Sequence, residues 1–160
     1  MANFVFKETQ RFNQPWIWVF LVLVTGITFY GIFTQPIEGW EVIIPIMILG
    51  LVVILFVSLQ LKTRIDEYGL SFSYFPFIGQ RKYSIDQIEK LELIEYNSLT
   101  KFGGWGIRYN FSMWGYNVGG KHGLIVTLKD KKFLIGTQKP EEMQKAIKQF
   151  EELKSAYNAR

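Results

Sequence analysis

The sequence predicts a membrane-embedded α-helical hairpin followed by an α+β domain, an antiparallel roll or barrel closed by one C-terminal amphipathic helix. Two long uncharged runs lie within residues 1–61, where Lys and Arg number 2 and Asp and Glu number 3. Residues 62–139 alternate apolar and polar side chains in short segments, and residues from Pro140 repeat apolar side chains at helical spacing. We therefore expect a hairpin unit at residues 1–61 and a cytoplasmic domain at residues 62–160.

Each uncharged run has the length of a membrane span. The spans are predicted at residues 15–33 and 42–61, which is 19 and 20 residues without a charge. A helix needs roughly 20 residues to cross about 30 Å of hydrocarbon. A chain of 160 residues has no large core in which to bury two such helices. The short connection Thr34–Glu41 makes them an antiparallel hairpin.

Basic residues predict the orientation of this hairpin. Lys7 and Arg11 precede the first span, Lys62 and Arg64 follow the second, and the connection carries Glu38 and Glu41 without Lys or Arg. The positive-inside rule then places both termini in the cytoplasm. We expect a multi-pass protein of the cytoplasmic (inner) membrane.

The second part of the chain reads as strands closed by a helix. Residues 63–67 and 70–75 form a predicted hairpin around Tyr68-Gly69, in which Leu70, Phe72 and Tyr74 share one face. Further strands are predicted at residues 80–84, 89–96, 123–128 and 132–136. Pro140 opens a helix at about 140–157. Its apolar side is predicted to comprise Met143, Ala146, Ile147, Phe150, Leu153 and Tyr157.

Residues 62–153 resemble the bacterial pleckstrin-homology-like (PH-like) domains that follow a two-helix membrane hairpin. The matching motifs are the Asp66–Leu70 turn, Tyr83–Ile88 entering a long strand, the Gly-rich stretches, and Ile135–Pro140 leading into the helix. Most members of that group have no assigned reaction. The resemblance therefore implies an architecture more than a function.

Lys101–Gly123 is rich in aromatic residues and glycine and is too long for an ordinary hairpin connection. As candidate partner contacts we take five aromatic residues and one Arg: Phe102, Trp105, Arg108, Tyr109, Trp114 and Tyr116. As candidate backbone corners we take Gly103, Gly104, Gly106, Gly115, Gly119 and Gly120.

Two interpretations of this segment stay open. Trp, Tyr and Arg are the residue types that anchor protein interfaces, which favours a partner surface. Small barrels also need bulky side chains inside, which favours a core role. We expect Trp105, in its Gly-Gly-Trp-Gly setting, to be a contact, and leave Trp114 undecided. Nucleic-acid binding is disfavoured because Arg108, Lys101 and Lys121 form no broad basic stripe.

The composition excludes several chemistries. The chain has no cysteine and one histidine, His122, so thiolate sites and histidine pairs are impossible. Gly103–Gly106 lacks the Gly-Lys-Ser/Thr ending of a phosphate-binding loop. Glu89, Glu92 and Glu95 alternate with apolar residues, as on the wet face of a strand. We predict no catalytic residue, metal or cofactor.

The function expected from these observations is binding rather than catalysis. We expect a membrane-tethered module that acts as an accessory or assembly subunit of a membrane complex, with a membrane-protein partner or a second copy of itself. The alternative is a domain that binds lipid headgroups or senses the membrane surface. The Glu67-Tyr68-Gly69 turn does not favour that alternative, because eukaryotic phosphoinositide-binding PH domains resemble one another in a basic first hairpin.

Overall fold

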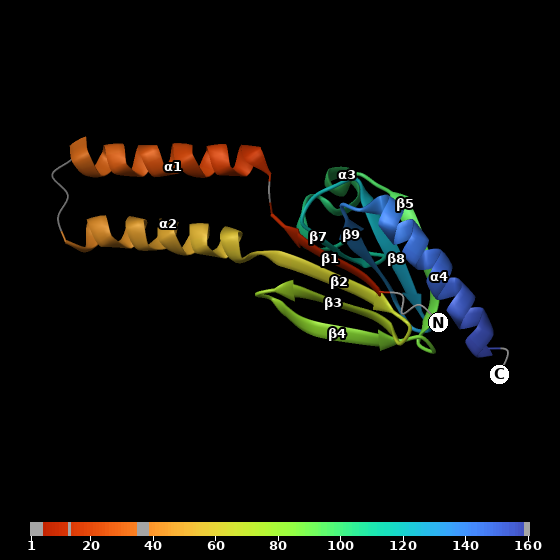
Figure 1. Cartoon of the computed structure of the whole chain (residues 1–160). Helices are drawn as coiled ribbons and strands as arrows, with labels where there is room; N and C mark the ends of the chain where they lie inside the picture. The colour runs from red at the N-terminus through yellow and green to blue at the C-terminus, as the bar shows by residue number, and fades with distance from the viewer. Residues whose placement is uncertain (1–4, 13, 35–38, 159–160) are drawn as a thin grey trace. The chain divides into compact units, whose positions relative to one another are not determined.

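A computed structural model describes residues 5–12, 14–34 and 39–158. The chain divides into two compact units, which are described separately. One unit is the helical segment Phe12–Leu59, and the other combines Met1–Arg11 with Gln60–Arg160. The colours of Figure 1 follow the chain through both.

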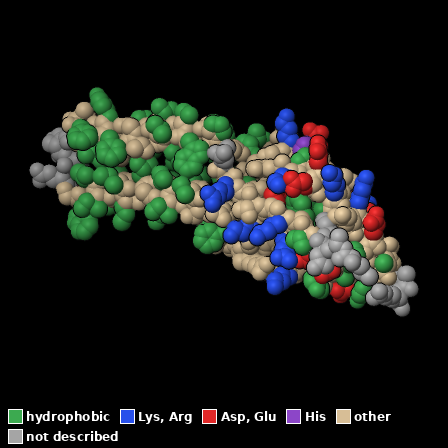
Figure 2. Space-filling model, viewed as in Figure 1, with side chains coloured by type: hydrophobic (Ala, Val, Ile, Leu, Met, Phe, Trp, Pro, Cys, Tyr) green, Lys and Arg blue, Asp and Glu red, His purple; other side chains and the backbone are tan. Residues whose placement is uncertain are grey.

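The helical unit consists of α1 (Pro15–Thr34) and α2 (Trp40–Ser58). Both are long and apolar enough to cross a membrane. Their side chains are mostly exposed, and Figure 2 shows hydrophobic side chains along both helices. A core helix of a soluble protein would instead bury such a surface, so the unit is compatible with a membrane protein. Residues 35–38 of the predicted connection lie outside the described residues.

The second helix begins and ends earlier than the predicted span at 42–61. Trp40 and Glu41 already form its first turn, and Ser58 is its last residue. Leu61, expected to end the span, instead lies in strand β2 (Gln60–Asp66) and is fully buried. Hydropathy alone cannot separate a membrane helix from a buried strand that follows it directly.

The structure divides the chain differently from the predicted boundary after residue 61. Val5–Arg11 forms strand β1, which pairs antiparallel with β2 from Val5↔Asp66 to Arg11↔Gln60. The helical hairpin is therefore an insertion between two paired strands. Buried and exposed residues alternate along β1, but the sequence shows no matching alternation of apolar and polar residues. The reason is that two of the three buried side chains, Glu8 and Gln10, are polar.

Sheet 1 has the strand order β1-β2-β3-β4, all antiparallel, with β3 at Gly69–Phe75 and β4 at Ile78–Ser84. Leu70, Phe72 and Tyr74 share its buried face, as predicted. Ser71 and Ser73 lie on the opposite face. The period-2 pattern of β3 thus fixes which face of sheet 1 is the core face.

Sheet 2 has the order β5-β8-β9-β7-β6, and its strands span Ile88–Glu95, His122–Leu128, Lys132–Thr137, Trp114–Asn117 and Gly106–Tyr109, respectively. The β7–β9 pair is parallel and the other pairs are antiparallel. The two sheets do not close into a barrel. The predicted antiparallel roll or barrel is corrected to two sheets, because the β6–β7 hairpin adds to the outer edge of β9.

The core lies between the sheets. Phe72 of sheet 1 lies 4.9 Å from Tyr116 and 5.4 Å from Phe133 of sheet 2, measured between ring centroids. At its other end, β9 contacts β1, where the Thr137 hydroxyl donates to Glu8. Strand β9 therefore crosses sheet 1 from β3 to β1.

The C-terminal helix α4 (Pro140–Asn158) contacts β5 and β8 of sheet 2 and β1 and β2 of sheet 1. It covers one open side of the two-sheet core (Figure 1). Met143, Ala146, Ile147 and Phe150 are buried, as predicted. Leu153 and Tyr157 are exposed, so the buried stripe ends earlier than the apolar pattern.

Candidate functional site

The aromatic and Gly-rich segment contains one short helix and one hairpin. Helix α3 (Ser98–Phe102) has Asn97 as its N-cap, and the Asn97 side chain accepts a hydrogen bond from the Leu99 amide at 2.9 Å. Its C-cap is Gly103, which has the left-handed φ of 68° that favours glycine. Strands β6 and β7 follow.

Two of the predicted contacts belong to the core. Phe102 and Tyr116 are only 6% and 4% exposed. The Phe102 ring meets Tyr96 edge-on at 5.9 Å, within a cluster with Met113 and Leu134. Gly115 lies beneath this ring, and a Cβ atom there would come within 2.7 Å of Phe102. For these residues the core interpretation holds, and the contact prediction is wrong.

Three other aromatic rings form an exposed group on the β6–β7 hairpin. Tyr109, Phe111 and Trp114 are 53%, 96% and 48% exposed. The Tyr109 ring lies 5.2 Å from Trp114 and 6.3 Å from Phe111. We call these three residues the aromatic hairpin tip. Tyr109 and Trp114 are among the candidate contacts, and Phe111 is not.

Local hydrogen bonds order this turn. The Asn110 side chain accepts from the amides of Ser112 and Met113, and the Asn110 amide donates to the Met113 carbonyl. Phe111 has a φ of 63°, which is uncommon outside glycine. The only sequence signal for this arrangement is Asn110, a residue that favours such turns.

The remaining candidates are Trp105, Arg108 and the six glycines. Trp105 is half-buried, and Arg108 is exposed and donates from Nε to the Trp105 carbonyl at 3.3 Å. Of the six predicted glycine corners, five have positive φ: Gly103, Gly104, Gly106, Gly119 and Gly120. Gly115 serves close packing instead.

A groove of about 430 Å³ runs beside the aromatic hairpin tip. The groove is lined from sheet 2 by Ile107, Trp114 and Tyr116. It is lined from β4 and the β3–β4 turn by Phe77, Ile78 and Tyr83. Its charged lining residues are Arg81, Lys131 and Lys132, all cationic. Lys131 lies over the Tyr83 ring at 5.7 Å. Burial raises the pKa of Tyr116, while the nearby Arg81 opposes that shift.

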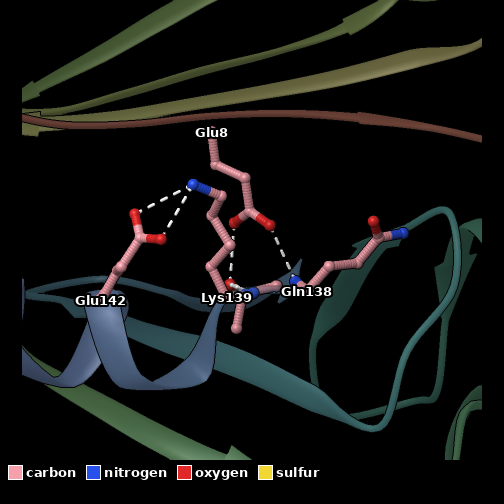
Figure 3. Close-up of polar contacts among 5 residues, drawn as sticks. Glu8, Gln138, Lys139 and Glu142 are labelled. Carbon is pink, nitrogen blue, oxygen red and sulfur yellow. Dashed lines mark hydrogen bonds and ion pairs between the residues drawn. The ribbon is translucent and has the colours of Figure 1, made fainter.

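Glu8 is a buried polar residue of the core that no pattern in the sequence indicates. Its carboxylate accepts from the Thr137 hydroxyl at 2.7 Å and from the Gln138 amide at 2.8 Å, while Lys139 pairs with Glu142 (Figure 3). Glu8 is 4% exposed, and burial raises its pKa despite these hydrogen bonds. Nearby Gln10 donates to the Gly136 carbonyl at 2.6 Å. These contacts tie β1 to β9 and the start of α4.

The described parts of the chain contain no group of three His, Asp or Glu side chains placed to hold a metal ion. His122 lies at the start of β8 and is half-buried. Glu89 and Glu95 are exposed and Glu92 is half-buried on β5. Glu92 and Glu95 are three residues apart in a stretch of regular pairing, so they lie on opposite faces, and the prediction that these carboxylates share one wet face is wrong. The basic residues predicted to set the topology, Lys7, Arg11, Lys62 and Arg64, are exposed on β1 and β2.

Comparison with models of known protein families found no match, and neither the curated proteins nor the solved structures contain a match to this chain. The resemblance to bacterial PH-like domains therefore stays a prediction. The arrangement offers an exposed aromatic group and a cationic groove, both suited to binding.

Proposed function

We propose that this protein is a non-catalytic, membrane-tethered binding module, an accessory or assembly subunit of a complex in the cytoplasmic membrane. In this proposal α1 and α2 cross the membrane, both termini lie in the cytoplasm, and the two-sheet unit presents the aromatic hairpin tip to a membrane-protein partner. The partner's complementary surface has an apolar pocket with acidic side chains at its margin.

The aromatic hairpin tip is the observation that carries this proposal. Phe111 is 96% exposed, so its ring adds almost nothing to the folding of this domain. It stands on an ordered turn beside the Tyr109 and Trp114 rings. Exposed aromatic groups held on a rigid hairpin are typical of interface anchors, because little side-chain entropy is lost on binding.

Basic residues near the aromatic hairpin tip support the proposal that the partner's pocket has acidic side chains at its margin. Arg108 lies on β6 next to the tip, and Arg81, Lys131 and Lys132 line the groove that Trp114 shares. Apolar rings beside cations complement an apolar pocket beside carboxylates.

Purification of the full chain in mild detergent at native expression tests the proposal. Phe111→Ala should remove the co-purifying partner, since loss of an interface anchor typically costs about 2 kcal/mol or more, roughly 30-fold in affinity. The melting temperature of the Phe111→Ala variant should match the wild-type value. Tyr157→Ala removes another exposed ring, 57% exposed on α4, and should keep the partner.

Two outcomes contradict the proposal. Phe111→Ala could retain every wild-type partner at wild-type yield. Alternatively, differently tagged copies could capture only each other, and Phe111→Ala could abolish that capture. The tip would then join copies of this chain rather than bind a different membrane protein.

A further inference from the structure

The outward face of sheet 1 carries a concentration of positive charge. Strands alternate their side chains between faces, and the buried residues of β1, β2 and β3 occupy the core face. The exposed basic residues on the opposite face are Lys7, Arg11, Lys62, Arg64 and Lys82, which we call the basic face. Figure 2 shows Lys and Arg side chains gathered over these strands.

Strand register places these cations close together. Lys7 lies directly opposite Arg64, Arg64 opposite Ser71, and Ser71 opposite Lys82, so one row across the sheet holds three cations. Like charges directly opposite each other destabilise a sheet. Asp66 pairs with Arg64 at 2.8 Å, at the far end of β2. The row therefore has an excess of positive charge that an anion would relieve.

Hydroxyl groups and a depression accompany the cations. Thr9 lies opposite Lys62, and Lys62 lies opposite Ser73 in β3. A depression of about 490 Å³ is lined by Arg64, Ser71, Gln80 and Lys82, with Asp66 and Ser84 among its other polar residues. Phosphate oxygens accept hydrogen bonds from both cationic side chains and hydroxyl groups.

One edge of this face is aromatic. Arg11 pairs with Gln60, and Gln60 pairs with Phe75, so these residues share one end of sheet 1. Phe75 is 57% exposed, and Phe77 in the adjoining turn is 60% exposed. Membrane-surface elements that combine Lys or Arg with Phe bury the Phe rings at the boundary between headgroups and acyl chains.

The chain connects this same end of the sheet to the apolar helices. Leu59 alone separates Ser58 of α2 from Gln60 of β2. Two residue steps span at most about 7 Å, so covalent connection keeps Gln60 close to the helix end. Basic segments adjoining membrane spans attract anionic lipids, and the attraction falls off within a Debye length.

We infer that the basic face, with Phe75 and Phe77 at its edge, binds anionic phospholipid headgroups of the leaflet from which α1 and α2 emerge. The cations and hydroxyls contact the phosphates, and the two rings enter the interfacial layer. This inference goes beyond the proposed function, because its cations lie on the outward face of sheet 1 and variants of the aromatic hairpin tip in sheet 2 leave them unchanged. Phe77 is the one residue of this inference that also lines the groove beside the tip.

Site-directed spin labelling of the full chain in nanodiscs tests this inference. The chain lacks cysteine, so Thr9→Cys labels the basic face alone, and Ser155→Cys labels α4 as a control. The discs are phosphatidylcholine with or without about 30% phosphatidylglycerol. Exposure of the Thr9→Cys label to a water-soluble relaxing agent should fall several-fold in the anionic discs. The Ser155→Cys label should not change.

Two triple variants that remove the same amount of charge distinguish binding by the basic face from an effect of the protein's net charge. Lys62→Gln/Arg64→Gln/Lys82→Gln should abolish the protection, whereas Lys129→Gln/Lys145→Gln/Lys148→Gln removes as much charge from exposed positions elsewhere and should preserve it. Phe75→Ser/Phe77→Ser should weaken it.

Three results would overturn the inference. The Thr9→Cys label could be equally exposed in neutral and anionic discs. The two triple variants could lose protection equally, which would indicate net charge alone. Polyuridylate could protect the label in neutral discs while anionic discs do not, which would assign the face to nucleic acid.

Discussion

Glu8 places an ionisable group in the two-sheet core. Its hydrogen bonds from Thr137 and Gln138 favour the carboxylate, as does the nearby Lys139 charge, but burial is the larger effect and raises the pKa. Glu142 acts in the same direction as burial. The carboxylate thus holds the end of β9 and the residue that follows it by hydrogen bonds, and its ionisation costs some stability.

This balance predicts a pH-dependent stability that Glu8→Gln should remove. Below the ordinary pKa of 4.5 both folded and unfolded chains hold the proton. As pH rises from there towards the raised native pKa, the unfolded chain releases its proton first, so wild-type stability falls relative to Glu8→Gln. Melting temperatures of the two proteins, compared from pH 4 to pH 8, should diverge in that direction.

Glu8→Ala provides the control for the hydrogen bonds. It leaves the Thr137 hydroxyl and the Gln138 amide without a side-chain acceptor, which should lower stability by about 1–3 kcal/mol relative to Glu8→Gln. That difference should be the same at every pH, because neither variant carries the ionisable group. A constant difference between wild type and Glu8→Gln across the pH range would contradict the role assigned to burial.

Gly115 is required by packing rather than by a turn. A Cβ atom at this position would lie 2.7–2.9 Å from three carbons of the buried Phe102 ring. Gly115→Ala should therefore destabilise the domain by about 1–3 kcal/mol, seen as a lower melting temperature. Gly79→Ala, where nothing lies within 4 Å of the added atom, should change stability by less than about 0.5 kcal/mol. Restored stability in Gly115→Ala/Phe102→Leu would identify the ring as the obstacle, and an unchanged Gly115→Ala would refute the contact.

At the scale of elements, β1 is the strand that joins residues on either side of the helical hairpin. Phe6, Glu8 and Gln10 point into the core of a domain whose other strands all follow Ser58. The connection between β1 and β2 holds the whole hairpin, and closure of a long loop costs only slightly more than closure of a short one. The pairing is therefore compatible with so large an insertion.

The prediction for this element uses adjacent residues with opposite exposure. Phe6 is 5% exposed and Val5 is 48% exposed. Phe6→Ala should cost about 3–5 kcal/mol of domain stability, as expected for a buried ring. Val5→Ala should change it by less than about 0.5 kcal/mol. Chemical denaturation of the full chain in detergent measures both, and similar effects of the two substitutions would exclude β1 from the core.

At the scale of the whole molecule, charge asymmetry predicts how the chain is oriented in a bilayer. Lys7 and Arg11 precede α1, and Lys62 and Arg64 follow α2. The charged residues from Gln35 to Glu41 are Glu38 and Glu41, both acidic. The positive-inside rule assigns the basic ends to the cytoplasm.

Cysteine labelling in intact cells measures this orientation. Gln35→Cys, in the connection between the helices, should react with an impermeant thiol reagent, and Ser155→Cys on α4 should react only after the cells are opened. The chain has no cysteine of its own, so the signal comes from the introduced residue. The opposite labelling pattern would reverse the predicted topology.

The sequence by itself determined the elements whose signal is local. Uninterrupted apolar runs predicted α1 and α2 to within a few residues, period-2 alternation predicted the buried face of β3, and Pro140 marked the start of α4. Length and periodicity predict such elements because each depends on neighbouring residues alone.

Only the tertiary structure decided the membership of β1, the parallel pairing of β7 with β9, and the separation of core from exposed aromatic residues. Phe102 and Phe111 lie in the same aromatic stretch, yet the first is buried against Tyr96 and the second is almost wholly exposed. The basic residues that predict the membrane orientation lie on two strands, and the pairing of β1 with β2 brings them together on one face. These features depend on contacts between residues far apart in the chain, and residue type does not encode which distant strand a segment will meet.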